Sequence, residues 1–359
     1  METVNDFSTE KPRDNLTNAS FFNEQDQNTS LNSAEIANIW SSFMISSIQS
    51  CIIKYLQKTV EDQETLGILN YALETVQKHH HRAMKFFQED RHPVPQGFTD
   101  NDVNLNAPRL FSDLFILCYI EKLAEIRING YSTALPMTAR KDVLDFFNEC
   151  LASSAELYNK VTRVMLSKGF FIRSPYIETP GKIDFVKKQN YLAGFFGNRR
   201  HLNVIEISHI FNSIKVNTFR KALFIGFSQV ADSKKVREYM LRGKEISTKH
   251  IKIFGSIMIK NDLPISMSWD LGVTDSTIPP FSDKLMMQHI RAMNVVEMAY
   301  YGKAFSSSTR NDLAVNFSRL MLEIGKYAED SLNILIDNGW LEEIPQIIDR
   351  DALAKSIHH

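Results

Sequence analysis

Phe111-Ser112-Asp113 and Phe281-Ser282-Asp283 are the same three residues, 170 positions apart in a chain of 359. At that offset the later matches are Tyr131/Tyr301, Ala134/Ala304, Arg140/Arg310, Asp142/Asp312, Phe147/Phe317, Gly169/Gly339 and Pro175/Pro345. Upstream, an offset of 171 aligns Glu35-Ile36 with Glu206-Ile207, Ile39 with Ile210, Lys78-His79 with Lys249-His250 and Pro93 with Pro264. This period is too long for a solenoid unit, so the sequence indicates two tandem copies of one whole domain.

Helical periodicity divides each copy into four long segments. In copy one they run from about Ala34 to Lys58, Asp62 to Asp90, Ser112 to Ala134 and Thr138 to Lys168. In copy two they run from about Ile205 to Val230, Asp232 to Asn261, Ser282 to Ala304 and Ser308 to Asn338. Segments of this length predict helices of roughly 40 Å. Four of them in each copy predict a four-helix bundle.

The connections set the predicted topology. Short turns join the first helix to the second and the third to the fourth, which predicts two antiparallel hairpins in each copy. The second connection is long, from His92 to Leu110 and from Leu263 to Pro280. About eighteen extended residues reach up to roughly 60 Å, which is enough to cross the length of the bundle. We therefore predict an all-α fold of two tandem four-helix bundles with long crossover loops.

The predicted domain boundaries follow from these segments. We expect a disordered tail over 1–31, a first bundle over 32–175, a second bundle over 204–346 and a C-terminal tail over 347–359. Residues 176–203 join the copies and are apolar. We expect them to pack across the interface between the bundles.

Composition limits the classes of partner. The net charge of -1 gives no general attraction to nucleic acid. No run approaches the roughly 18 to 20 apolar residues of a membrane span, and the acidic, Asn/Ser-rich N-terminus lacks the apolar core of a secretory signal. The three cysteines, Cys51, Cys118 and Cys150, have no metal-site spacing. They predict reduced core thiols in a cytoplasmic chain.

Several stretches resemble a known family. They are Ala34-Glu35-Ile36 with Trp40, Pro95-Gln96-Gly97-Phe98-Thr99, the run from Asn104 to Asp113, the run from Ser154 to Lys160, and Asp337-Asn338-Gly339-Trp340. The family is uncharacterised and consists of duplicated ferritin-like bundles from spore-forming bacteria. Its members are labelled as spore coat proteins by similarity to the coat F family. The resemblance covers about 32–355. It implies a ferritin-like fold and an association with spores, and it assigns no biochemical role to any residue.

A ferritin-like bundle suggests a di-iron or di-manganese centre. That centre takes a Glu from each of two helices and a Glu-x-x-His pair from each of the other two. His79 and His250 are the only histidines shared by the copies, and Val76 and Ser247 stand three residues before them. The Glu-x-x-His pattern is therefore missing. We predict that both histidines serve packing and that each gives a ring N–H to a carbonyl or hydroxyl on a neighbouring helix.

Glu74 and Glu245 are the nearest shared acids, five residues before the histidines. Each lies four residues before a lysine, which favours a solvated Glu–Lys pair. The sequence thus predicts no cofactor. The low-ranked alternative is a site relocated into one copy, with His79, His250, Glu74 and Glu245 as its candidate ligands.

Two further shared pairs are Glu35 with Arg140 and Glu206 with Arg310. Each Glu stands three residues after an Asn, which is the pattern of a capping box at a helix start rather than of a metal ligand. The crossover topology brings the first and fourth helices to the same end of the bundle. We therefore predict salt bridges from Arg140 to Glu35 and from Arg310 to Glu206. A ligand-binding arginine is the alternative.

Two functions from different classes remain. The first is a non-enzymatic structural or interaction protein with protein partners or self-association, cytoplasmic or associated with the spore coat. The second is a ferritin-like protein that binds a metal or small ligand at a degenerate or relocated site in one bundle. No phosphate loop, nucleophile elbow or zinc motif points to an enzyme.

Overall fold

The computed structural model describes residues 29–195, 199–265 and 268–356, where every long element is an α-helix. Copy one contains α1 (Ser33–Thr59), α2 (Gln63–Glu89), α3 (Asp113–Ala134) and α4 (Lys141–Ser167). Copy two contains α5 (Val204–Val230), α6 (Lys234–Ile259), α7 (Asp283–Ser307) and α8 (Asn311–Asp337), and a short α9 (Arg350–Ser356) follows. The predicted all-α fold of two tandem domains is confirmed. The helix ends lie within about three residues of the predicted ones. Helix α7 continues to Ser307, beyond its predicted end at Ala304.

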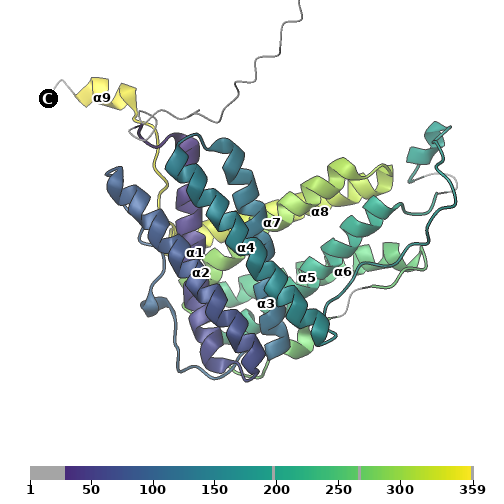
Figure 1. Cartoon of the computed structure of the whole chain (residues 1–359), viewed down its shortest axis with the longest axis horizontal. Helices are drawn as coiled ribbons and strands as arrows, with labels where there is room; N and C mark the ends of the chain where they lie inside the picture. Colours follow the sequence, from purple (N-terminus) through teal and green to yellow (C-terminus); the bar gives the residue numbers. More distant parts are fainter. Residues whose placement is uncertain (1–28, 196–198, 266–267, 357–359) are drawn as a thin grey trace, which may run out of the picture.

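Helices that follow one another pair in space: α1 with α2, α3 with α4, α5 with α6 and α7 with α8. The carboxylate of Asp113, at the start of α3, accepts hydrogen bonds from the backbone of Glu61 and Asp62 in the α1–α2 turn. Helix α3 therefore begins at the end of the copy opposite to the end of α2. The connection between them must travel the length of the helices, and Figure 1 shows it doing so.

The two crossovers pair with each other. Isolated antiparallel bridges join Val103 to Phe281 and Phe111 to Val273. The amide of Ser112 donates to the carbonyl of Gly272 at 2.8 Å. At the equivalent position of copy two, the amide of Ser282 donates to the carbonyl of Asp102 at 2.9 Å. The repeated Phe-Ser-Asp motif thus lies at the joint between the copies.

The copies also share a core. One central cluster combines buried side chains of both, including Tyr55 and Phe115 of copy one and Phe219, Phe227 and Phe281 of copy two. Two smaller clusters fill the outer ends, one around Phe147 in copy one and one around Phe317 in copy two. The chain is therefore one two-lobed body, and the helices of copy two run obliquely away from those of copy one in Figure 1.

The expectation for 176–203 is wrong. This segment leaves α4 and runs along the outside of copy two to its far end (Figure 1), with Tyr176, Ile183 and Phe185 largely exposed. Its last residues contact the outer end of copy two: the Arg200 guanidinium pairs with Glu206 of α5, the Arg200 carbonyl accepts from Arg310 at the start of α8, and Leu202 is buried in the outer cluster. Residues 196–198 lie outside the described residues. The joint is already filled by the crossovers and by Phe171, which packs against the central cluster, so it leaves the rest of the segment outside.

The terminal segments differ in part from the prediction. Residues 1–28 of the predicted tail lie outside the described residues. The end of that tail is held to copy one: Leu31 is buried, and the carbonyl of the exposed Thr29 accepts a hydrogen bond from Arg140. At the other terminus, α9 occupies most of the predicted tail, and 357–359 are not described.

Helix α1 is the one described helix that is long and apolar enough to cross a membrane by length and composition. Of its most apolar window, 56% is buried inside the protein. A core helix passes the same test, and α1 contributes Ile39, Phe43, Ile53 and Tyr55 to the core clusters.

Candidate functional site

A ring of four polar side chains lies at the centre of each copy, one from each long helix. In copy two the four are Arg220 of α5, His250 of α6, Glu297 of α7 and Glu323 of α8. At the aligned positions, copy one has Gln49 of α1, His79 of α2, Arg127 of α3 and Ser153 of α4. Glu323 and Ser153 reach partly to the surface, and the other six are buried. Each ring thus holds one buried guanidinium.

Neutral groups surround Arg127 in copy one. Its guanidinium donates to Gln49 Oε1 at 2.5 Å and to the Tyr131 hydroxyl at 2.7 Å, and it contacts His79 Nδ1. His79 Nε2 lies 2.9 Å from Ser153 Oγ. Since Nδ1 accepts from the arginine, the ring proton is on Nε2 and is donated to Ser153. The predicted contact of His79 with a hydroxyl on a neighbouring helix is therefore present.

An ion pair forms the centre of copy two. The guanidinium of Arg220 contacts the carboxylate of Glu297 directly and donates to Asn294 Oδ1 at 2.6 Å. Arg220 and Glu297 are both almost completely shielded from solvent. Removing one partner of such a pair would leave an uncompensated buried charge, which costs about 3–5 kcal/mol.

His250 links this ion pair to the fourth helix. Its Nδ1 lies 2.9 Å from the Tyr301 hydroxyl and 3.9 Å from Glu297 Oε1, and its Nε2 lies 3.2 Å from Glu323 Oε2. Tyr301 aligns with Tyr131, so both copies keep the same histidine–tyrosine contact.

The rings carry their arginine on opposite helices. Gln49 of copy one aligns with Arg220 of copy two, and Arg127 aligns with Glu297. The first helix thus supplies the guanidinium in copy two, and the third helix supplies it in copy one. The amide or carboxylate acceptor has moved to the facing helix in each case. The helix that carries the arginine therefore differs between the copies, but in both the guanidinium lies at the centre of the ring.

Both ring histidines are held neutral. Burial, together with the positive charge of the neighbouring Arg127, lowers the pKa of His79 to about 2. Burial lowers the pKa of His250 to about 4, although Glu323 opposes the shift. Neutral imidazole can accept one hydrogen bond and donate one, which is how both rings are used here.

The residues do not fit a di-iron or di-manganese centre. Glu74 and Glu245 are exposed on the outer faces of α2 and α6, away from the histidines. Both ring nitrogens of each histidine already have hydrogen-bond partners, and a guanidinium fills the centre where a cation would lie. No group of three or more His, Cys, Asp or Glu in the described ranges is arranged to hold a metal.

The lysines expected beside those acids pair elsewhere. Lys78 contacts Glu149 of α4, and Lys249 pairs with Glu323 of α8 at 2.7 Å. The ion pairs run between helices rather than along one helix. The predicted pairs with Glu74 and Glu245 are wrong because an acid on the facing helix lies within reach of each lysine.

The predicted capping boxes are confirmed, with Glu35 and Asn32 in α1 and Glu206 and Asn203 in α5. The predicted salt bridge from Arg140 to Glu35 is wrong. Glu35 Oε1 accepts from the backbone amides of Ala139 and Arg140, so it also caps the start of α4. A carboxylate on exposed N–H groups at a helix start is favourable without a guanidinium.

The guanidinium groups pair instead with nearby aspartates. Arg140 binds Asp90 and Asp142, and Arg310 binds Asp312. Glu206 accepts from the amide of Arg310 and pairs with the guanidinium of Arg200, which lowers the pKa of Glu206 against the effect of burial. The predicted Arg310–Glu206 salt bridge is therefore wrong for the same reason. All of these groups serve the outer ends of the copies.

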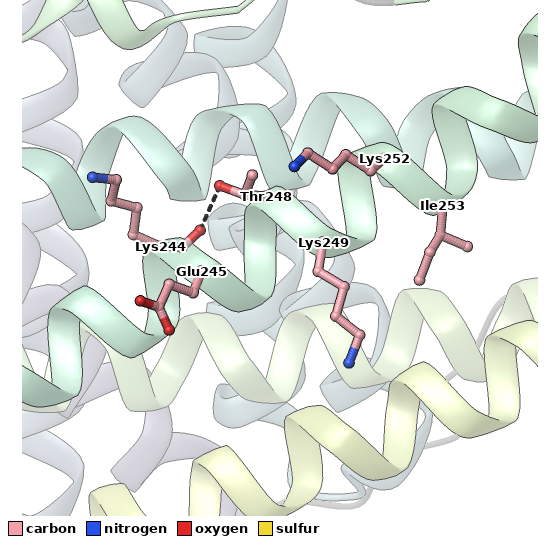
Figure 2. A pocket seen from close by; sticks show the side chains of 6 residues that line it. All are labelled: Lys244, Glu245, Thr248, Lys249, Lys252 and Ile253. Atoms are coloured by element: carbon pink, nitrogen blue, oxygen red, sulfur yellow. Dashed lines mark hydrogen bonds between the residues drawn. The ribbon is translucent and has the colours of Figure 1, made fainter.

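A hollow of about 540 Å³ lies on the surface of α6. Figure 2 shows that Lys244 and Lys252 extend on one side of the helix and Lys249 on the other. The side chains do not converge on a common point, and the single hydrogen bond among them holds Thr248 to its own helix. This surface is therefore a weaker candidate than the rings.

The cysteines are not reactive groups. Cys51, Cys118 and Cys150 are all buried, and burial raises the pKa of each thiol to about 12. A thiol rather than a thiolate is present at neutral pH, so none is a nucleophile or metal ligand there.

The family is clear from the whole length of the chain. A family model described as a protein of unknown function (DUF3231) matches residues 20–183 and again residues 191–353. The chain belongs to the DUF3231 family. Two consecutive matches agree with the duplication and with the two lobes. No curated protein matches.

One solved structure is similar to part of the chain. It is described as a "putative spore coat protein" from Bacillus halodurans C-125 and is 16% identical, with a TM-score of 0.39. The match covers 43% of this chain and 99% of that one. These values are too low to support an inference about function.

Sequence reasoning missed the four residues that exchange charge, Gln49, Arg127, Arg220 and Glu297. These positions differ between the copies, so identity between the copies does not mark them. A usable signal was present: two aligned positions on facing helices change together, from glutamine and arginine to arginine and glutamate. Co-variation of this kind indicates spatial contact.

Proposed function

We propose that this protein is a non-enzymatic structural and interaction protein whose two lobes form one scaffold. The observation that carries the proposal is the buried guanidinium at the centre of each ring. A bundle that used this place for chemistry would need it open to a metal or substrate. Here Arg127 and Arg220 fill it: the neutral His79 holds Arg127, and Glu297 and Asn294 hold Arg220.

The finer form of the proposal is that each lobe is a ferritin-like bundle that has replaced its metal by arginine. Its support is the long crossover between the second and third helices and the origin of one ring residue from each helix. The association with spores rests on the resemblance of the sequence to coat F-like proteins. Immunoblots of fractionated spores and mother cells would test that association.

Metal analysis of the full-length protein tests the proposal most simply. The protein is purified without an affinity tag from cells supplied with iron, manganese and zinc. We expect far less than one metal ion per chain and no change in thermal stability after treatment with a chelator. One ion per chain, lost together with stability when His250 is changed to Phe, would instead support the metal-binding alternative.

A further inference from the structure

Two apolar surfaces are exposed to solvent, one on the segment that joins the copies and one on α8 of copy two. The first, called the strap, is the extended segment 176–186, in which Tyr176, Ile183, Phe185 and Val186 are 84%, 89%, 80% and 62% exposed. Soluble chains rarely expose so many large apolar side chains together unless they bind something. In the single chain the strap lies along the outside of copy two (Figure 1), and every residue of the strap is exposed.

The second surface, called the α8 stripe, consists of Val315, Leu322, Glu329 and Ile336. These residues are seven apart and therefore share one face of α8. Val315, Leu322 and Ile336 are 50%, 68% and 59% exposed.

Copy one lacks this stripe. The positions of α4 that align with the first three stripe residues are Asp145, Ala152 and Asn159. Because both copies have the same helices, the fold does not require an apolar face on α8. The face is therefore available for a purpose other than folding.

Within one chain, the segments that follow α4 and α8 already contact the other copy. The residues just after α4 pack onto the other copy, with Phe171 against the central cluster and the ring of Phe171 under the Lys215 ammonium. The residues just after α8 do the same in reverse: the Glu342 carboxylate accepts from the backbone amides of Gln96 and Gly97. The strap directly continues the first of these two segments.

We infer that the strap of one chain packs on the α8 stripe of a second copy of the same chain, so that the protein assembles with itself. The contact would repeat between chains what the segments after α4 and α8 already do within one chain. Charge also fits: Glu329 on the stripe and Lys188, two residues after the strap, each lack an ion-pair partner in the described part of the chain. This inference rests on the proposed function, because it names a second copy as the partner.

The test measures the mass of the full-length protein in solution by light scattering and sedimentation over a range of concentrations. We expect a dimer or larger assembly. The strap variant Ile183→Asp/Phe185→Asp and the stripe variant Leu322→Asp should each weaken association roughly 10-fold or more, since burial of one large side chain contributes about 1.5–3 kcal/mol. Leu271→Asp, at a fully exposed leucine outside both surfaces, should assemble like the original protein.

Mixing the two variants gives the sharpest result. The strap variant retains an intact α8 stripe, and the stripe variant retains an intact strap, so we expect the mixture to assemble more tightly than either variant does alone. Circular dichroism should show unchanged folding, because the altered residues are exposed. A monomeric original protein, normal assembly of Leu322→Asp, no assembly in the mixture, or dispersal of Leu271→Asp would each overturn the inference. A monomer free of metal would leave the proposed function standing.

Discussion

Single buried residues set the electrostatics of the interior. His289 lies at the joint against the aligned Tyr119, with 5.7 Å between the ring centroids. Its Nε2 has no hydrogen-bond partner, and burial lowers the pKa of His289 to about 4. Unlike His79 and His250, this histidine has no polar contact to maintain. It should therefore be replaceable by an aromatic residue of similar size.

We predict that His289→Phe makes the protein less sensitive to acid. The unfolded ring takes up a proton below a pH of about 6.5, whereas the folded ring does so only near 4, so protonation favours the unfolded state as the pH falls through this window. Between pH 7 and pH 5, the free energy of unfolding of the original protein should fall by about 1–2 kcal/mol more than that of the variant. Urea unfolding at the two pH values measures the difference. Equal losses would show that the folded His289 ring takes up its proton over the same pH range as the unfolded one.

At the scale of the element, aspartates tie each hairpin to the third helix. Asp113 accepts from the amides of Glu61 and Asp62, and Asp283 accepts from those of Asp232 and Ser233 at 3.2 and 2.7 Å. Each carboxylate thus closes the turn between the two preceding helices, and its negative charge at a helix start is itself favourable.

We predict that Asp283→Ala destabilises the protein by about 1–3 kcal/mol, because two backbone N–H groups lose their acceptor. Burial raises the pKa of Asp283, although the hydrogen bonds from the two amides lower it, so the comparison is made at neutral pH. Asp275→Ala is a suitable control, since Asp275 lies on the surface of the same crossover. A loss as small as that of the control would mean that water replaces the carboxylate.

The helices were predictable and the joint was not. Apolar periodicity and the caps at Asn32 and Ser112 locate the helix ends, because these are local effects of neighbouring residues. Phe111 and Phe281 look like ordinary core residues in the sequence. Nothing local says that they pack against the other copy, since an apolar side chain has no preference for one apolar neighbour over another. The same limit explains the wrong expectation for 176–203.

At the scale of the whole molecule, the central cluster makes the two lobes depend on each other. Phe115 of copy one stacks on Phe219 of copy two, with ring centroids 5.3 Å apart. Buried charges also cross the joint, where the Lys215 ammonium lies 2.5 Å from Glu121. A lobe on its own would expose both features to water.

We therefore predict that the chain unfolds in one cooperative transition. Hydrogen exchange in increasing urea should expose the core helices of both copies, such as α2 and α6, at the same midpoint. Two separate midpoints would show that the lobes are independent domains joined by a linker.

The central claim is that a guanidinium is the structural occupant of each ring, and an exchange of rings tests it most directly. Arg220→Gln with Glu297→Arg gives copy two the glutamine and arginine of copy one. Each single change should lower the free energy of unfolding by about 3–5 kcal/mol, because it leaves a buried charge unpaired. The double variant should recover most of that loss in urea unfolding. Losses in the double variant that equal the sum of the singles would contradict the account.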